Sequence, residues 1–333
     1  MTIKDIARLS GYGVSTVSRA LNGHPDVSEE TKNKINEIVE KYKFVPNSNA
    51  RQLKQNQSKD IAIIVKGSFN LFFATIIENI QIYLSKANIN AMVHYSDEYS
   101  DEVKIAQKVQ NEQKPMGIIF LGGNIEFLKK SFKHITVPCV LCTTNGNQII
   151  ASNLSSVSVD DIKGAEAAVD FLLQNSHKHI GIIGGNINKS YTSKLRLMGC
   201  ENSFAKNQLT FSTDYYEESD FSINCAYEAT KTLLSKHSDI TAIFAMSDIM
   251  ALGTISAIHD MGKSVPDDIS VIGFDGIELG KYYIPKLTTI KQPEKELAKL
   301  SVKKIINMIN NTESSSHILL NASLLEGNSV KKI

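Results

Sequence analysis

Apolar residues in the first 45 positions recur at the three- and four-residue spacing of short amphipathic helices, and the pattern predicts three of them. Thr2, three residues before Asp5, resembles a capping box at the start of the first helix, and Ser28 is placed to cap the third. Asn22-Gly23 is expected to stop the second. The positions predicted to face a common core are Ile3, Ile6, Ala7, Val17, Ala20, Leu21, Ile35, Ile38, Val39 and Tyr42.

The second predicted helix, over residues 14–21, turns small polar side chains outwards. At a hundred degrees per residue, Ser15, Ser18, Arg19 and Asn22 lie opposite its apolar stripe. Two helices joined by a short turn, the second with a small polar outer face, suit reading of the DNA major groove. An arginine can span both acceptors of a guanine edge. From periodicity alone, a three-helix bundle with a harmless polar face stays an equal alternative.

Residues 47–58 form a polar stretch in which Ala50 and Leu53 are the apolar members. So few apolar groups cannot bury a surface of their own, so the stretch is expected to be a linker that becomes helical only with a partner. The expected organisation is a DNA-binding head at 1–46, a hinge helix or linker at 47–58, and a core at 59–333.

From Ile61 onwards, short apolar runs alternate with helical stretches. This alternation is typical of an α/β fold with parallel sheets covered by helices. The strands fall into two groups of similar rhythm, the second beginning around Val157, so two sheets are expected. Strands are predicted at 61–65, 91–95, 117–121, 137–142, 180–184, 242–246 and 270–274. Helices are predicted near 70–86, 101–111, 161–175, 194–206, 222–236, 248–261 and 294–309.

Composition is that of an ordinary soluble globular protein, with 42% hydrophobic and 21% charged residues in 333. The net charge of +1 hides a basic excess at the N-terminus, where residues 1–57 hold nine Lys/Arg and six Asp/Glu. No basic-then-apolar secretion signal opens the chain, and no run of eighteen apolar residues occurs. A cytoplasmic location without a membrane partner is therefore expected.

Motifs for enzyme chemistry are weak. Gly122-Gly123 and Gly184-Gly185 follow apolar runs but lack the glycine spacing of nucleotide-binding loops. No hydrolase-type serine motif occurs, and His177 and His179 are too close for ligation from one helix face. The four cysteines are too few and scattered for a disulfide framework, and Cys139 with Cys142 is a weak zinc signal, so reduced, mostly buried thiols are expected. No catalytic residue, metal or cofactor is predicted.

Four sequence blocks at fixed spacing carry a resemblance to a known family. They are Thr2–Gly11, Thr16–Asn22, Val27–Ser28 and Phe44–Asn47, the last followed by Ala50, Arg51 and Leu53. Together they resemble the head and hinge of the lactose-repressor/galactose-repressor family of transcription regulators. One departure lies in the turn, where Gly11-Tyr12-Gly13 replaces the family's usual Gly-Val-Ser, so one capping and phosphate-binding serine is missing.

The resemblance implies a role for each matching position. It implies that Val14, Ser15 and Arg19 read bases in the major groove. Contacts to the phosphate backbone are implied for Thr16, Ser18 and Asn22. The resemblance further implies that Leu53 of the hinge wedges open a base step from the minor groove, with Asn47 and Ala50 at nearby base edges. An apolar wedge in a polar linker suits this role, because bending the duplex offsets the cost of unstacking.

The remainder of the chain resembles the same family's core, which shares its fold with periplasmic sugar-binding proteins. The matching blocks are Ile61–Val65, Asn70–Phe73, Val159–Ala165, Ile180–Gly185, Arg196–Gly199, Ser247–Gly253, Val271–Asp275 and Pro285–Ile290. The implied subdomains are about 59–156 with 291–319, and about 157–290 with 320–333.

A sugar site needs an aromatic wall and charged or amide groups that form paired hydrogen bonds with hydroxyls. By resemblance, Asp275 and Arg196 bind hydroxyls and Phe221 stacks on the sugar ring. Further lining is implied for Asn70, Phe73, Thr192 and Ser247, although many relatives carry Asn at the position of Ser247.

The implied function is a ligand-responsive transcription regulator, most simply a repressor of carbohydrate-utilisation genes. Its expected partners are a palindromic double-stranded DNA operator, a second copy of the chain, and a small-molecule effector, a sugar or sugar phosphate. A core that responds to a protein partner or a non-sugar metabolite stays open as an alternative.

Overall fold

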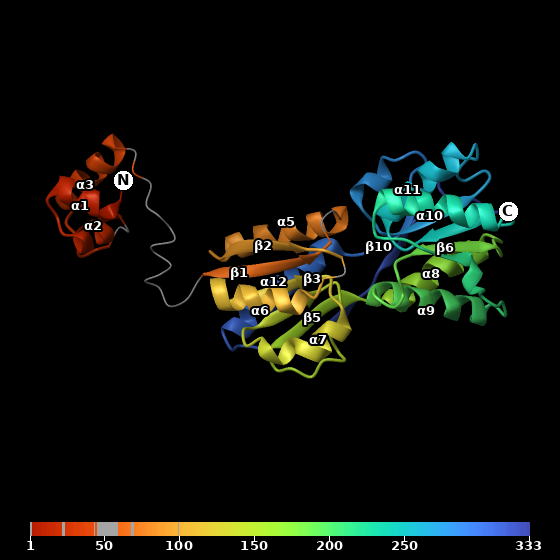
Figure 1. The fold of residues 1–333 in the computed structure, drawn as a ribbon, viewed down its shortest axis with the longest axis horizontal. Coiled ribbons are helices and arrows are strands. Elements are labelled where there is room, and N and C mark those ends of the chain that lie inside the picture. Colours follow the sequence, from red (N-terminus) through yellow and green to blue (C-terminus); the bar gives the residue numbers. More distant parts are fainter. Residues whose placement is uncertain (1, 22–23, 43, 45–58, 68–69, 99) are drawn as a thin grey trace. The chain divides into compact units, whose positions relative to one another are not determined.

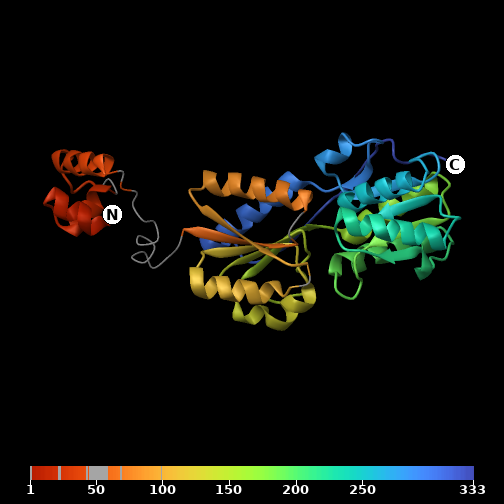
Figure 2. The same ribbon diagram turned by 45° about the horizontal axis from the view of Figure 1, so that its top comes forward.

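A computed structural model describes the chain apart from residues 1, 22–23, 43, 45–58, 68–69 and 99. The chain divides into two compact units, Met1–Ser58 and Lys59–Ile333. Figures 1 and 2 show a small helical unit, in red, and a larger unit made of two lobes, each a sheet covered by helices.

The first unit is a bundle of three helices, α1 (Ile3–Ser10), α2 (Val14–Leu21) and α3 (Glu29–Lys41). The Asp5 carboxylate accepts the backbone N–H of Thr2 at 2.8 Å, and Ser28 caps α3 by accepting from the N–H of Thr31. Tyr42 was expected in the core but is 44% exposed, because α3 ends at Lys41 and Phe44, not Tyr42, packs against the core. The buried core of this unit consists of Ile6, Ala7, Val17, Ala20, Val27 and Ile35.

The first lobe of the larger unit is built on a six-stranded parallel sheet. In order across the sheet, its strands are β11 (His317–Leu320), β5 (Leu154–Val159), β4 (Cys139–Cys142), β3 (Gly117–Leu121), β1 (Asp60–Lys66) and β2 (Asn90–Ser96). The helices of this lobe are α5 (Leu71–Lys86), α6 (Glu102–Gln113), α7 (Ile125–Ser131), the 3₁₀ turn η1 (Phe132–His134) and α12 (Glu294–Ile309).

Helices pack on both faces of strand β1. Ile61, Ile63 and Val65 face α5 and α12, whereas Ala62 and Ile64 face α6 and α7. Side chains of a strand alternate between faces, so a central strand covered on both sides reads as a continuous apolar run. This is the reason that 61–65 could be predicted as a buried strand.

The second lobe also has six strands, of which one edge strand is antiparallel. In order, they are β12 (Ser323–Leu325, antiparallel), β10 (Thr288–Lys291), β9 (Ser270–Asp275), β8 (Ala242–Ala245), β6 (Ile180–Gly184) and β7 (Tyr216–Glu218). The helices are α8 (Asp161–Gln174), α9 (Tyr191–Lys206), α10 (Ile223–Lys236) and α11 (Asp248–Asp260), with 3₁₀ turns η2 (Thr213–Tyr215) and η3 (Glu278–Lys281).

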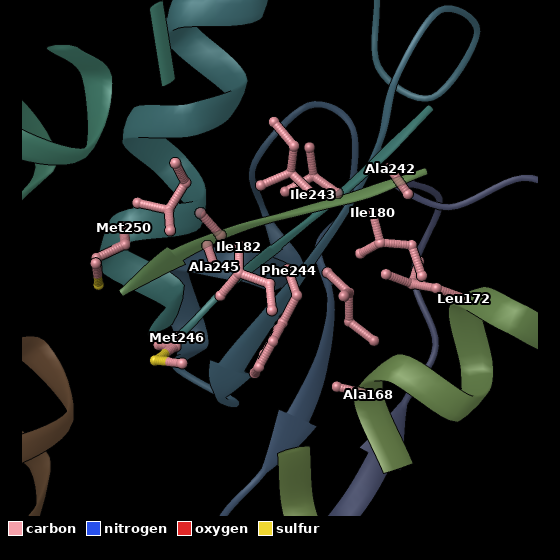
Figure 3. Close-up of a cluster of buried hydrophobic side chains, with 14 of the residues drawn as sticks. Ala168, Leu172, Ile180, Ile182, Ala242, Ile243, Phe244, Ala245, Met246 and Met250 are labelled. Atoms are coloured by element: carbon pink, nitrogen blue, oxygen red, sulfur yellow. The ribbon is translucent and has the colours of Figure 1, made fainter. Parts of the chain in front are cut away.

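The core of the second lobe is a buried layer between helices on either side of the sheet. Figure 3 shows Ile182 and Phe244 of the central strands between Met250 of α11 and the α8 residues Ala168 and Leu172. Helices α8 and α9 pack on each other, as do α10 and α11. Two pairs of helices therefore cover this sheet on both sides. Residues at the ends of its strands form part of the candidate site.

The chain passes between the lobes three times, after β5, after β10 and after β11. Strand β5 stays in the first sheet as far as Val159, so the first passage comes slightly later than the expected residue 157. The alternating α/β architecture with two sheets is confirmed, and each strand and helix predicted in the larger unit is present, with the predicted ends for β3, β6 and α12 and shifted ends for the others.

The thiols also agree with prediction: all four cysteines are free, and Cys139, Cys142 and Cys200 are buried. In the part of the chain that the structure describes, no group of three or more His, Cys, Asp and Glu side chains could hold a metal ion. Nor do these residues include a helix long and apolar enough to cross a membrane.

Candidate DNA-binding surface and effector cleft

Helix α2 presents the polar face that the sequence predicted. Val17 and Ala20 are buried, whereas Val14, Ser15 and Arg19 are exposed. The predicted backbone contacts Thr16 and Ser18 are half-buried at the edges of the same face. The remaining predicted contacts, Asn22 in the head and Asn47, Ala50 and Leu53 in the hinge, lie outside the described residues.

Arg19 is held by the loop that follows α2. A terminal guanidinium nitrogen of Arg19 lies 2.8 Å from Oδ2 of Asp26, and Oδ1 of Asp26 lies 2.6 Å from Nδ1 of His24. More than half of the Arg19 side chain stays exposed. An ion pair at this exposure contributes about 0–1 kcal/mol, so the guanidinium is oriented but can exchange partners.

The larger unit contains a cleft that encloses about 680 Å³ of space open to solvent. Its walls come from residues at or after the carboxyl ends of parallel strands, where open α/β sheets bind ligands. Six of the seven predicted effector residues line it, namely Asn70, Phe73, Thr192, Arg196, Phe221 and Asp275. The other lining residues are Lys66, Phe72, Glu98, Gly122, Gly123, Asn124, Thr143, Lys189, Ser190, Tyr191 and Gln292.

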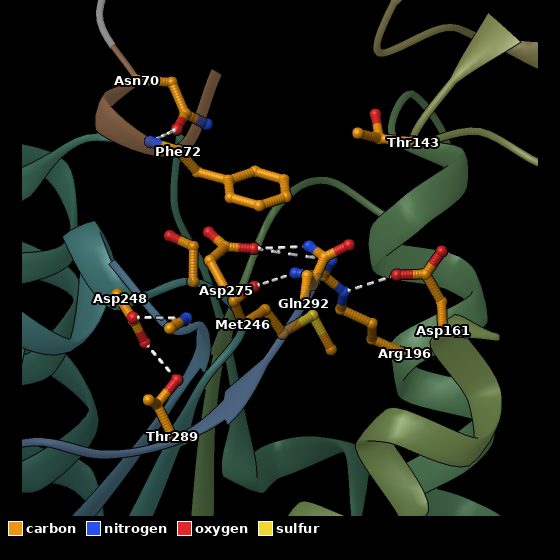
Figure 4. A network of polar contacts seen from close by, with 12 residues as sticks. Asn70, Phe72, Thr143, Asp161, Arg196, Met246, Asp248, Asp275, Thr289 and Gln292 are labelled. Carbon is orange, nitrogen blue, oxygen red and sulfur yellow. Dashed lines mark hydrogen bonds and ion pairs between the residues drawn. The ribbon is translucent and has the colours of Figure 1, made fainter. Parts of the chain in front are cut away.

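Asp275 and Gln292 form the polar floor of the cleft. Nε2 of Gln292 donates to Oδ1 of Asp275 at 2.8 Å, and a terminal nitrogen of Arg196 lies 3.9 Å from the same oxygen. Figure 4 shows these three side chains together, with the ring of Phe72 pointing toward them. An aromatic face beside paired hydrogen-bonding groups is the arrangement that a sugar site requires.

Arg196 is fixed on three sides although it lines the cleft. Its Nε donates to Asp161 at 2.9 Å, a terminal nitrogen donates to the carbonyl of Met246, and the guanidinium lies 3.6 Å from the centre of the Phe274 ring. These contacts hold the planar group in one orientation before a ligand arrives, which lowers the entropic cost of binding.

Burial raises the pKa of Asp275 to about 7, while the Arg196 guanidinium and the Gln292 amide oppose the rise. The backbone at Asp275 has φ of 120°, a value that side-chain-bearing residues rarely adopt. Gly276 follows with φ of 77°. A non-glycine residue held in such a conformation is often part of a functional site.

The wall from the first lobe carries a second charged group. Nζ of Lys66 lies 3.2 Å from Glu102, which is buried and also accepts the backbone N–H of Asn124. Glu98 faces the cleft, and burial raises its pKa to about 7, with Lys66 opposing the rise and Asp220 of the second lobe adding to it.

Ser247 does not line the cleft. It is 2% exposed and caps α11 by accepting the backbone N–H of Met250. Of the lining residues not predicted, Lys66 ends β1, Thr143 follows β4, and Gln292 follows β10. For Lys66 and Thr143, a position directly after a predicted strand was the signal that could have identified them, whereas Gln292 follows a strand that was not predicted.

Comparison with known proteins identifies both units. Residues 2–47 match the profile described as bacterial regulatory proteins, lacI family, and residues 169–330 match that of a periplasmic binding protein-like domain. The Lac repressor dimer bound to operator and the anti-inducer ONPF has the same fold, with a TM-score of 0.80 over 99% of each chain at 24% identity.

Two curated relatives match along nearly their whole length. The chain is 31% identical to the ribose operon repressor of Haemophilus influenzae, covering 96% of this chain and 95% of that protein. It is 40% identical to the HTH-type transcriptional regulator MalR of Clostridium butyricum, covering 99% of both. The protein therefore belongs to the lacI family of bacterial regulatory proteins, whose members are transcription regulators and not enzymes.

Proposed function

We propose that the protein is a repressor that binds a palindromic operator as a homodimer and changes its affinity for that operator when a sugar occupies the cleft. In this proposal Val14, Ser15 and Arg19 read bases, Thr16, Ser18 and Asn22 contact phosphates, and the hinge enters the minor groove through Leu53, with Asn47 and Ala50 beside it. The controlled genes would be those for carbohydrate use.

The observation that carries the proposal is the cleft floor. The buried Asp275 carboxyl lies 2.8 Å from the Gln292 amide and 3.9 Å from the anchored Arg196 guanidinium, and the aromatic residues Phe72 and Phe221 line the same cleft. Such a set can bind adjacent hydroxyls in pairs while a ring face covers the apolar side of a sugar. A relative named as a repressor of the ribose operon supports a carbohydrate link.

The topology supports the proposed coupling between the cleft and the operator. Three chain passages join the lobes, and the cleft takes residues from both. A ligand that binds the two walls together favours the closed arrangement, and differential affinity for two states is what shifts an equilibrium between them. Typical coupling energies of about 1–3 kcal/mol would change operator affinity by about 5- to 150-fold.

Substitution in the hinge tests the DNA half of the proposal. Leu53→Ala should abolish most of the preference for operator over random DNA, because the apolar wedge is lost, while salt-sensitive binding to any sequence persists. Fluorescence anisotropy with operator and random duplexes would measure both, and Gln52→Ala provides a neighbouring control. Unchanged operator preference in Leu53→Ala would refute the hinge assignment.

The sugar half is tested with the wild-type chain. Titrating ribose, glucose and a disaccharide such as cellobiose into the operator complex should change the anisotropy for at least one sugar. Asp275→Asn should remove the response while leaving operator binding itself in place. If no sugar changes operator affinity, the sugar-responsive part of the proposal fails while the DNA-binding part stands.

A further inference from the structure

Three helices, α5, α7 and α9, start at residues that line the cleft, and a side chain accepts from the first turn of each; at α7, Oδ1 of Asn124 accepts from the N–H of Glu126 at 2.9 Å. Oδ1 of Asn70 accepts from the N–H groups of Phe72 and Phe73 at 2.9 and 3.3 Å at the start of α5. Oγ of Ser190 accepts from the N–H of Ser193 at 3.2 Å at the start of α9. Open helix N-termini bind phosphate groups, but these caps already use one or two of the amides on which a phosphate would compete.

The buried cations of the cleft are also occupied. Lys66 is 10% exposed and pairs with the buried Glu102 at 3.2 Å, and Arg196 pairs with the buried Asp161 at 2.9 Å. Lys189 stands at the exposed rim. Since each inner cation has a carboxylate beside it, the interior offers a phosphate dianion little net positive charge.

Hydrogen-bond acceptors, in contrast, are in surplus. Oε1 of Gln292 is buried and has no hydrogen-bond partner among the described residues. The amide nitrogen donates to Asp275, and above the Asp275 pKa of about 7 the reverse orientation would set an amide oxygen against a carboxylate oxygen. Glu98 adds a second carboxyl to the lining. A buried acceptor without a donor is destabilising, so a ligand that supplies a donor is favoured.

We propose that the cleft selects an uncharged polyhydroxyl ligand and discriminates against the phosphorylated form of the same sugar. Hydroxyls of the ligand donate to Oε1 of Gln292 and to the carboxyl of Asp275. Because Lys66 is already paired with Glu102, its charge is not available to neutralise a phosphate. This inference rests on the proposed sugar-responsive function and narrows its ligand class. The cleft lacks hydrogen-bond donors and unpaired positive charge. A phosphate dianion supplies further acceptors and negative charge, so it meets neither need.

Matched pairs of sugars test the selectivity on the full wild-type chain. Isothermal titration at about pH 8, where a sugar phosphate is a dianion, would use glucose with glucose 6-phosphate, ribose with ribose 5-phosphate, and trehalose with trehalose 6-phosphate. In any pair that binds, the neutral sugar should bind at least about tenfold more tightly, since desolvated like charges cost several kcal/mol.

Two substitutions identify the groups responsible. Glu102→Gln keeps the shape and frees the charge of Lys66, so the ratio of neutral to phosphorylated affinity should fall by about tenfold. Glu112→Gln, on the exposed part of the same helix, removes an equal charge away from the cleft and should leave the ratio unchanged. Gln292→Met should weaken binding of the neutral sugar by about tenfold, because the Oε1 acceptor for its hydroxyl is lost.

The outcomes separate the two proposals. Equal or tighter binding of the phosphorylated sugar overturns the selectivity but leaves a sugar-responsive regulator. If the ratio of neutral-sugar to phosphorylated-sugar affinity is the same in Glu102→Gln and Glu112→Gln, the proposed role of the Lys66–Glu102 pair is overturned. Absence of binding by every sugar in all three pairs overturns the selectivity and the sugar-responsive function together, whereas operator binding is unaffected by any of these results.

Discussion

Arg19 has two competing partners for one guanidinium. In the DNA-free head it pairs with Asp26, which His24 also contacts, and all three side chains are substantially exposed. The ion pair is worth about 0–1 kcal/mol, whereas a bidentate contact to a guanine edge is worth about 1–3 kcal/mol. In the proposed complex DNA would therefore win the exchange, but Asp26 would keep a negative charge near the surface that approaches the phosphates.

Asp26→Asn should therefore strengthen binding to DNA of any sequence by several-fold, because it removes this repulsion and frees Arg19. The gain should be larger at low salt, where exposed charges interact over a longer range. Anisotropy titrations at several salt concentrations would measure it, with Glu201→Gln in the larger unit as a charge-matched control. Weaker binding by Asp26→Asn would instead indicate that Asp26 positions Arg19 for its base.

Glu98 is the residue whose ionisation is most open to a direct test. Its pKa is raised from 4.5 to about 7 by burial first, then by Asp220 and Glu102. A carboxyl with a raised folded pKa contributes stability that is complete below its ordinary value and is lost as the pH rises through about 7.

Glu98→Gln should remove this dependence, since the amide does not titrate. The melting temperature of the wild type minus that of Glu98→Gln should grow as the pH falls from about 8 to about 5. Differential scanning calorimetry at stepped pH would measure the difference, and Glu112→Gln should show none. Parallel pH curves for wild type and Glu98→Gln would contradict the assignment.

At the scale of elements, the first turn of α11 positions the end of β9. Oδ2 of Asp248 accepts the N–H groups of Gly276 and Ile277 at 2.8 Å each, and Oδ1 accepts the hydroxyl of Thr289 on β10. Burial raises the pKa of Asp248 well above its ordinary range, and the Asp275 carboxyl adds to the rise. One side chain thus joins three elements around the strained backbone of Asp275.

Asp248→Ala should destabilise the larger unit by about 3 kcal/mol, because it leaves buried donors without partners. It should also weaken binding of the responsive sugar, because Asp275 loses its support. Urea unfolding and titration of the sugar would measure the two effects. Asp248→Asn keeps one acceptor and should recover part of both, while Asp260→Asn, at the exposed end of α11, should change neither. Full sugar affinity in a destabilised Asp248→Ala would limit its role to folding.

The strength of the apolar signal decided what the sequence could predict, because the four-residue strands β4 and β8 were predicted while the six-residue, serine-rich β5 was not. Helices such as α5 and α12 and buried strands such as β1 carry a long periodic signal and were found. The seven-residue helix α7 and the short strands β5, β7, β10, β11 and β12 were not predicted as elements. Strand β11, for example, alternates exposed and half-buried positions, but its sequence, His-Ile-Leu-Leu, does not alternate between polar and apolar residues.

The site was predictable only where a motif marked it. Arg196 and Asp275 lie in blocks that resemble a family, and the structure brings both into the cleft. Gln292 follows a strand that was itself not predicted, so the tendency of ligands to bind at strand ends could not identify it. Ser247 lies in a recognised block, but local geometry uses its hydroxyl as a helix cap. Which side of a helix start faces a cleft depends on tertiary packing, which one sequence does not specify.

At the scale of the whole molecule, one exposed apolar segment supports the proposed dimer. Leu279, Tyr282 and Ile284 lie within six residues of one another and are 43%, 75% and 90% exposed. Single exposed apolar residues are ordinary, but clustered ones mark interaction surfaces. A twofold axis would bring this segment of one protomer against the same segment of its partner. Each residue would then contribute to the interface twice, once from each protomer.

Ile284→Asp should therefore shift the protein from dimer to monomer. Burying one isoleucine is worth about 1.5–3 kcal/mol, so a symmetric pair is worth about 3–6 kcal/mol, and a buried carboxylate costs more. Sedimentation velocity at micromolar concentration would detect the change, and affinity for a palindromic operator should fall toward that for a half-site.

The matched control for this change is Ile150→Asp. Ile150 is fully exposed on the other lobe without a neighbouring exposed apolar residue of that size, so the variant should stay dimeric. A charge at either position costs little in the folded monomer, because both side chains are already in water. A dimeric Ile284→Asp would place the interface elsewhere, and dissociation of both variants would indicate a general effect of added charge rather than a specific surface.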